Sequence, residues 1–234
     1  MREKKTFLDK FNDIITKIGT IILMNLLFLV SCIGVVTIGQ AWCGLLSALR
    51  FHIRGENWFD GFKFGFKNRF WRGTIAWCAV LALCVMSLFD LMAHINGSAD
   101  MAAIIASGVM FALVAMLSVS LLVLNVYIPT SVSNWLKNAV NMIFKGHIWL
   151  LLSAAIMWLP AVMAVFWPTL FTLTVMIFFA AYYALAALLM TLLLKDALLE
   201  FLVEARTEGT LTAEEGRLAN AEEEQYDEEE EEEA

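Results

Sequence analysis

Four long stretches without a charged side chain constrain this chain more than any other feature. No Asp, Glu, Lys or Arg occurs in residues 18–49, 73–89, 101–136 or 146–194, and these runs hold 32, 17, 36 and 49 residues. A helix needs roughly 20 mostly apolar residues to cross about 30 Å of hydrocarbon. Only 17% of the whole chain is charged, against about a quarter in soluble domains. The runs therefore predict an all-α, polytopic transmembrane helix bundle.

The first run is too long for one perpendicular helix, because 32 residues extend about 48 Å at roughly 1.5 Å per residue. Residues 34–40 contain two glycines and adjacent β-branched residues, which weaken a helix. We therefore expect a break there, and residues 40–54 form either a short span or one arm of a re-entrant hairpin. About six membrane segments are predicted: residues 14–33, 40–54, 73–94, 101–128 and the two parts of 146–194 that Pro168 separates.

The basic residues predict the orientation of these segments. With the N-terminus in the cytoplasm, all 16 Lys and Arg residues fall in the N-terminus, near 50–72, in a loop near 129–145 and in the C-terminus. The outward turns near 34–40, 94–100 and 167–169 contain none. This distribution satisfies the positive-inside rule. It predicts a multi-pass membrane protein with both termini cytoplasmic, and a five-segment alternative would place six basic residues outside.

The cytoplasmic segment 57–72 has the pattern of an amphipathic helix. Four aromatic residues share one stripe and two lysines flank it: Phe59, Phe62, Phe66 and Phe70, with Lys63 and Lys67. Such a helix can lie at the membrane surface, with its rings in the acyl boundary and its cations among headgroups. The same rings could instead anchor a partner protein. Gly61 and Gly65 weaken an isolated helix, so we expect the membrane to support it.

The composition divides the chain into three parts. Residues 1–195 form the transmembrane domain and carry a net charge of +7, whereas residues 196–234 carry −14; together they give −7. Residues 196–206 are expected to continue the last helix into the cytoplasm. Residues 207–234 are polar and strongly acidic, which predicts a disordered, solvated tail. A contact between this tail and the basic 50–72 segment is the alternative.

Few side chains in the apolar segments could support chemistry. The candidate intramembrane polar residues are Asn25, Gln40, Asp90, His94 and Asn125. Asp90 and His94 are four residues apart and could share one helical face, while the amides more often bond across helices than bind substrate. The four cysteines form no Cys-x-x-Cys pair, and nucleotide-binding and hydrolase motifs are absent. We therefore expect no catalytic residues, no metal, no cofactor and no nucleic-acid partner. Small residues four apart should permit close helix contact in the pairs Gly44/Ala48, Gly108/Ala112 and Ala180/Ala184.

Residues 25–30 (Asn-Leu-Leu-Phe-Leu-Val) and 35–41 (Val-Val-Thr-Ile-Gly-Gln-Ala) resemble the YesL family (domain of unknown function 624). Its pattern continues with an Arg-Gly-Glu turn, matched by residues 54–56, and an amphipathic Phe/Lys helix. The resemblance is specific over residues 20–75. Gly34 and Gln40 stand where prolines are common in the family. The residues that match the motif are Thr37, Gly39, Arg54, Gly55 and Glu56.

The resemblance implies an integral membrane protein of uncharacterised activity, associated with carbohydrate ABC-type uptake in bacteria. We therefore expect an accessory component that binds the bilayer and the membrane subunits of a sugar importer. An independent small-solute transporter or channel is the first alternative. A membrane sensor that signals through the acidic tail is the second. The oligomeric state is left open.

Overall fold

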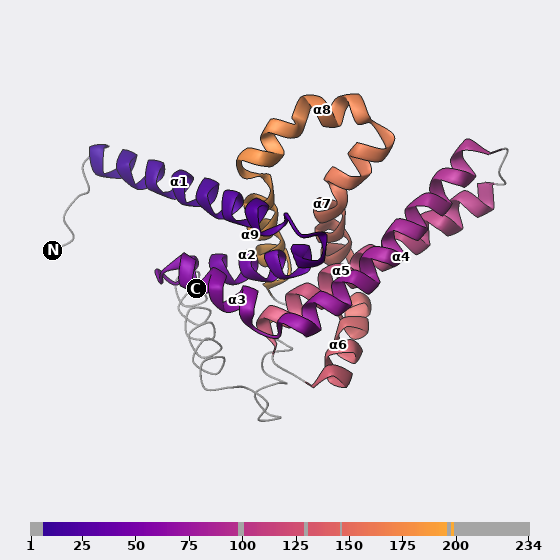
Figure 1. The fold of residues 1–234 in the computed structure, drawn as a ribbon, viewed down its shortest axis with the longest axis horizontal. Coiled ribbons are helices and arrows are strands. Elements are labelled where there is room, and N and C mark those ends of the chain that lie inside the picture. The colour runs from indigo at the N-terminus through magenta and orange to yellow at the C-terminus, as the bar shows by residue number, and fades with distance from the viewer. Residues whose placement is uncertain (1–6, 98–100, 129–130, 146, 196–197, 199–234) are drawn as a thin grey trace, which may run out of the picture.

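The computed structural model describes residues 7–97, 101–128, 131–145, 147–195 and 198, and these are helical almost throughout (Figure 1). Along the chain the helices are α1 (Phe7–Ser31), the 3₁₀ turn η1 (Val35–Thr37), α2 (Ile38–Ile53), α3 (Trp58–Lys67), α4 (Phe70–Asn96), α5 (Met101–Tyr127), α6 (Val132–Lys145), α7 (His147–Phe166), α8 (Pro168–Ile177), the π-helical turn η2 (Phe178–Tyr182) and α9 (Tyr183–Leu193). The expected all-α class is confirmed for the described residues.

Among the described residues, three helices are long and apolar enough to cross a membrane. These are α4, α5 and residues Ile148–Phe166 of α7. Helix α8 and the segment Ala180–Leu193, bent by 56° at η2, count as a fourth if the pair is one span. The structure therefore supports a membrane protein with three or four such helices, and a total of six segments stays a prediction.

Both expected helix breaks occur where the sequence placed them. Helix α1 ends at Ser31, and Gly34 in extended conformation precedes η1 before α2 begins at Ile38. The Thr37 hydroxyl donates a 2.6 Å hydrogen bond to the Ser31 carbonyl, which links the two ends of this break. The second break separates α7 from α8, which begins at Pro168.

Helix α2 lies at the centre of the fold. Residues 39–51 of α2 are all buried, and the helix packs against α1, α3, α4, α5 and α9. A helix that is apolar on every side is expected to be surrounded by other helices. The predicted segment at residues 40–54 is thus present as a helix in the core of the described bundle, and its place in the membrane stays a prediction.

Helices α2 and α3 form a tight antiparallel hairpin. Gly44 of α2 faces the Phe62 ring, and a Cβ built at Gly44 would lie 3.1 Å from it. A Cβ on Gly61 would lie 2.8 Å from the Ser47 carbonyl oxygen, and one on Gly65 would collide with the Cys43 carbonyl oxygen. The two α3 glycines therefore serve close backbone contact with α2, although from the sequence alone they were expected only to weaken an isolated helix.

One helix was missed in the sequence. The stretch near 129–145 was expected to be a loop, but it contains α6 from Val132 to Lys145. Trp135, Ala139 and Met142 lie at i, i+4 and i+7 and are buried, so they form one apolar stripe against the bundle. Hydropathy does not predict this helix, because only three of its 14 residues are buried and the segment has no long apolar run. The helical spacing of the three residues does predict it.

The long helices extend away from this core. Helices α4 and α5 pack together as an antiparallel pair that projects from the rest, and α8 lies across the top of the view, where it contacts α7 and η2 (Figure 1). A Cβ at Gly108 of α5 would touch nothing within 4 Å, so the Gly108/Ala112 pair does not serve a close contact in this chain.

Candidate functional site

Polar side chains from three helices meet where α3 ends and α4 begins. We call this group the polar junction; it comprises Gln40, Cys43, Arg69 and Asn125. Gln40 Nε2 donates to the Phe70 carbonyl at 2.6 Å, and Arg69 Nη1 donates to the Asn125 carbonyl at 3.4 Å. Asn125 Nδ2 donates to Cys43 Sγ at 3.5 Å. Gln40, Cys43 and Asn125 are buried. The bonds join α2 and α5 to the start of α4, just after the break between α3 and α4.

Gly73 makes room for the junction. A Cβ at Gly73 would collide with Gln40 Nε2 and lie 3.1 Å from Asn125 Nδ2. The other amide atoms, Gln40 Oε1 and Asn125 Oδ1, are buried without a hydrogen-bond partner among the described residues. Both amides therefore contact the first turn of α4, and only glycine is small enough for position 73.

A small cavity adjoins this turn. It measures about 10 Å³ and is lined by residues of α4, α5 and α6: Gly73, Ala76, Trp77, Val80, Ser118, Leu121, Leu122 and Trp135. Trp77 Nε1 is buried and has no partner within the described part of the chain. A space of about 10 Å³ is the size of one water molecule, so the cavity can hold a water but not an organic solute.

The polar junction corrects one part of the predicted topology. The distribution of basic residues placed the 34–40 turn outside and residues 50–72 in the cytoplasm, on opposite sides of about 30 Å of hydrocarbon. Gln40 touches the Phe70 carbonyl, so these two placements cannot both hold. The reason is that α3 runs back along α2, whereas the charge pattern predicts one surface segment over residues 50–72.

A second polar group joins α1, α7 and α9 at two helix irregularities. We call it the helix-break group; it comprises Asn25, Pro160, Tyr182 and Ala184. Pro160 lies inside α7 and has no N–H for the carbonyl of Ile156, four residues earlier. The Tyr182 hydroxyl donates to that Ile156 carbonyl at 2.5 Å. Tyr182 ends the π turn η2, and Ala184, just after it, donates its N–H to Asn25 Oδ1 at 3.1 Å. Backbone groups displaced by a proline and a π turn are thus satisfied from neighbouring helices, as an apolar environment requires.

This arrangement predicts a coupling between Tyr182 and Pro160. Tyr182→Phe should destabilise the protein by about 1 kcal/mol, because the Ile156 carbonyl loses its donor. In a Pro160→Ala background the same change should cost close to nothing, since the substituted alanine supplies an N–H to that carbonyl. Unfolding in detergent, followed by tryptophan fluorescence, measures both steps of the cycle. Tyr183→Phe is the matched control, and equal losses in both backgrounds would contradict the coupling.

Asp90 and His94 lie together near the end of α4. Asp90 Oδ1 is 3.5 Å from His94 Nε2, and Asp90 Oδ2 accepts a 2.6 Å hydrogen bond from Ser107 of α5. The Asp90 and His94 side chains are 59% and 37% exposed. The group therefore joins α4 to α5 at an accessible position. Among the described residues, no cluster of three or more His, Cys, Asp or Glu side chains could hold a metal ion.

The motif residues build the two turns that flank α2. Thr37 closes the break before α2, and Gly39 lies against Trp77, so that a Cβ there would collide with the tryptophan. After α2, Gly55 adopts φ +72°, which favours glycine. Arg54 caps α2, and the Glu56 N–H donates to the Phe51 carbonyl at 2.9 Å. The motif thus defines the ends of the central helix.

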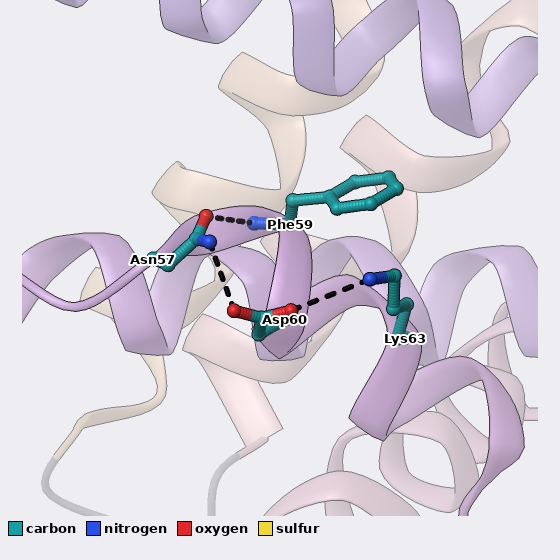
Figure 2. A network of polar contacts seen from close by, with 4 residues as sticks. All are labelled: Asn57, Phe59, Asp60 and Lys63. Carbon is teal, nitrogen blue, oxygen red and sulfur yellow. Dashed lines mark hydrogen bonds and ion pairs between the residues drawn. The ribbon is translucent and has the colours of Figure 1, made fainter.

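The aromatic and basic residues of segment 57–72 divide between two faces and two helices. Phe62 is buried against Gly44, Phe66 packs partly against the core, and Phe59 is 41% exposed. Phe70 belongs to α4 rather than to α3. Figure 2 shows the start of α3: Asn57 Oδ1 accepts from the Phe59 N–H, and Asp60 bridges Asn57 and Lys63. The predicted aromatic stripe is therefore mostly an internal packing face, while the lysines stay on the exposed side.

The described side chains thus provide hydrogen bonds between helices, a space for one water and an exposed cationic face. They indicate a class: a helical membrane protein whose interior amides bond to neighbouring helices. Residues 21–91 match the family described as "Protein of unknown function, DUF624", which confirms the family resemblance over that part of the chain. No curated protein and no solved structure matches the chain.

Some residues of these groups were not found from the sequence. Cys43, Arg69 and Ser107 complete bonds to predicted candidates, and Pro160 and Tyr182 were overlooked. Pro160 carried a readable signal, because a proline within an apolar helix frees a carbonyl four residues earlier. Which side chain reaches that carbonyl depends on tertiary packing alone.

Proposed function

We propose that this protein is a non-enzymatic accessory component of a bacterial membrane, which binds the membrane subunits of a carbohydrate ABC-type importer. The observation that supports the accessory role is that the interior amides form hydrogen bonds within the protein. Asn25, Gln40 and Asn125 each bond to another helix of the same chain. Pockets for small molecules measure about 300–1,000 Å³ and enclose most of their ligand, whereas the cavity beside Gly73, next to the Gln40 and Asn125 amides, holds about 10 Å³. The link to sugar uptake comes from the family resemblance.

Purification at native expression tests this proposal. An affinity tag after Ala234, with solubilisation in a mild detergent, should recover importer membrane subunits in stoichiometric amount. A similarly tagged, unrelated multi-pass protein of the same membrane is the control. Recovery of no importer subunit above that control would refute the accessory role.

We also propose a membrane topology that accommodates the Gln40–Phe70 contact. Helices α4, α5, α7 and the bent pair α8–α9 cross the membrane, and the α2–α3 hairpin lies at the cytoplasmic side. This places at one face the basic residues near the ends of the crossing segments: Arg69, Arg72, Lys137, Lys145 and Lys195. The apolar part of α1, Thr16–Ser31, has 16 residues and extends about 24 Å, less than about 30 Å of hydrocarbon. It enters the inner leaflet without crossing, so both termini stay cytoplasmic.

Cysteine labelling tests this topology. In a variant without native cysteines, Gly97→Cys should react with a membrane-impermeant maleimide on intact cells. Glu56→Cys should react only after the membrane is opened. Ile33→Cys, at a position 83% exposed in the isolated chain, should stay unlabelled from outside. Labelling of Ile33→Cys on intact cells would restore an outward turn and contradict the proposal.

A transporter is the second candidate function, and the Asp90–Ser107 bond favours it. A carboxylate shared between two helices, with His94 beside it, is an arrangement that can exchange a proton or cation. Reconstituted vesicles should then accumulate a solute, and Asp90→Asn should reduce the rate at least tenfold. Vesicles as tight as protein-free controls across sugars and ions would exclude this function. The tail-signalling alternative rests on residues 207–234, which lie outside the described residues.

A further inference from the structure

The exposed side of α3 carries an open hollow between two lysines. The hollow has a volume of about 360 Å³ and is lined by Lys63, Phe64, Lys67 and Asn68. Lysines four residues apart lie on the same helical face. The opposite side of α3, with Gly61, Phe62 and Gly65, faces α2. The hollow is therefore a cationic surface that the described bundle leaves uncovered.

The positive charge at this hollow is only partly compensated by its neighbours. The Lys63 ammonium lies 3.4 Å from Asp60 Oδ1 and 4.2 Å from the centre of the Phe59 ring. Lys67 has no ion pair within the described part of the chain. Residues 50–72 as a whole hold six basic and two acidic side chains. An anionic group that enters the hollow would meet a surface of matching charge.

The C-terminal residues of the same chain supply such a group. Residues 207–234 contain 13 acidic residues and one basic residue, and residues 227–233 form seven consecutive carboxylates. Leu194 and Leu198 are buried in the core, and α9 and α3 both pack on α2. The distance from Leu198 to the hollow is on the order of 20 Å, or two helix diameters, which about six extended residues can cover. The 36 residues that follow Leu198 are more than sufficient.

We propose that the acidic run of residues 227–233 binds the Lys63–Lys67 hollow of its own chain. A lipid phosphate is the competing anion, but it offers one or two charges, whereas the run offers seven carboxylates and is tethered. Tethering gives an effective concentration in the millimolar range. Since each exposed ion pair is weak and screened by salt, the contact forms at low ionic strength and opens at high ionic strength.

Zero-length cross-linking of the full chain tests this contact. A carbodiimide couples a carboxylate to a lysine amine and takes up the water that is lost, so it joins only groups already in contact. In neutral phosphatidylcholine nanodiscs at low salt, we expect links from Lys63 or Lys67 to residues 227–233 at about five times the yield of links to Lys137 of α6. A mixture of light and ¹⁵N-labelled chains distinguishes links within one chain from links between chains.

Variants and lipids complete the test. Lys63→Gln with Lys67→Gln should abolish the links, Lys137→Gln should leave their yield unchanged, and 0.5 M salt should lower it at least fivefold. Links spread equally over Lys137, links only between chains, or no links would overturn the proposal. In nanodiscs with anionic phosphatidylglycerol the yield should stay above half. Loss to background there would assign the hollow to lipid phosphate.

Discussion

Gly65→Ala is expected to destabilise the protein by about 3 kcal/mol, because the added methyl group would occupy the space of the Cys43 carbonyl oxygen. Its other near neighbour is Ser47 Cβ, at 2.5 Å from the built position. A backbone atom of the central helix cannot rotate away as a side-chain end can. The two helices must therefore separate, and the loss reaches every helix that packs on α2. Thermal unfolding in detergent, monitored by the fluorescence of the eight tryptophans, measures the loss.

Gly108→Ala is the matched control for this experiment. A Cβ at Gly108 meets nothing within 4 Å, and alanine is favoured over glycine inside a helix by roughly 0.5–1 kcal/mol. Gly108→Ala should therefore be neutral or slightly stabilising. If Gly65→Ala were equally neutral, the close packing of α3 on α2 would be wrong.

Gly73→Ala should cost about 2–3 kcal/mol, because the methyl group displaces the Gln40 amide from the Phe70 carbonyl and leaves buried polar groups unpaired. Gln40→Ala alone should cost about 2 kcal/mol through loss of the same bond. Once Gln40 is shortened, the methyl group added at position 73 has room. The double variant should therefore lose at least about 1 kcal/mol less than the sum of the single losses.

The same unfolding assay checks this cycle. Ala76→Gly, three residues further along α4, is a control that changes the helix backbone but adds no group near Gln40. Ala76→Gly should lower the free energy of unfolding by only about 1 kcal/mol. The loss should be the same when Gln40→Ala is also present. Strict additivity of Gly73→Ala and Gln40→Ala would mean that the two residues do not meet.

The sequence was informative about which polar residues matter and uninformative about their partners. Asn25, Gln40 and Asn125 were selected because polar side chains in apolar segments usually bond across helices. Each does so, to the Ala184 N–H, the Phe70 carbonyl and Cys43 Sγ. Those partners lie up to 159 residues away in the chain, and nothing in local pattern or spacing identifies them.

The amphipathic segment 57–72 shows the same limit. Its periodicity predicted a helix and a basic face, and α3 confirms the helix from Trp58 to Lys67. Periodicity does not say whether an apolar face meets lipid or another helix, because both are equally apolar. Phe62 meets Gly44 of α2, and only the folded structure could show it.

The sequence by itself determined the class and the approximate helices, because charge-free runs of 17 to 49 residues are stable only in an apolar environment. It also located the breaks before α2 and at Pro168, where backbone chemistry is local. Tertiary structure alone decided that α2 is central, that α3 returns along it, and that Gln40 reaches Phe70. The physical reason is that hydropathy and helix propensity act along the chain, whereas close glycine contacts and buried hydrogen bonds exist only between segments already brought together.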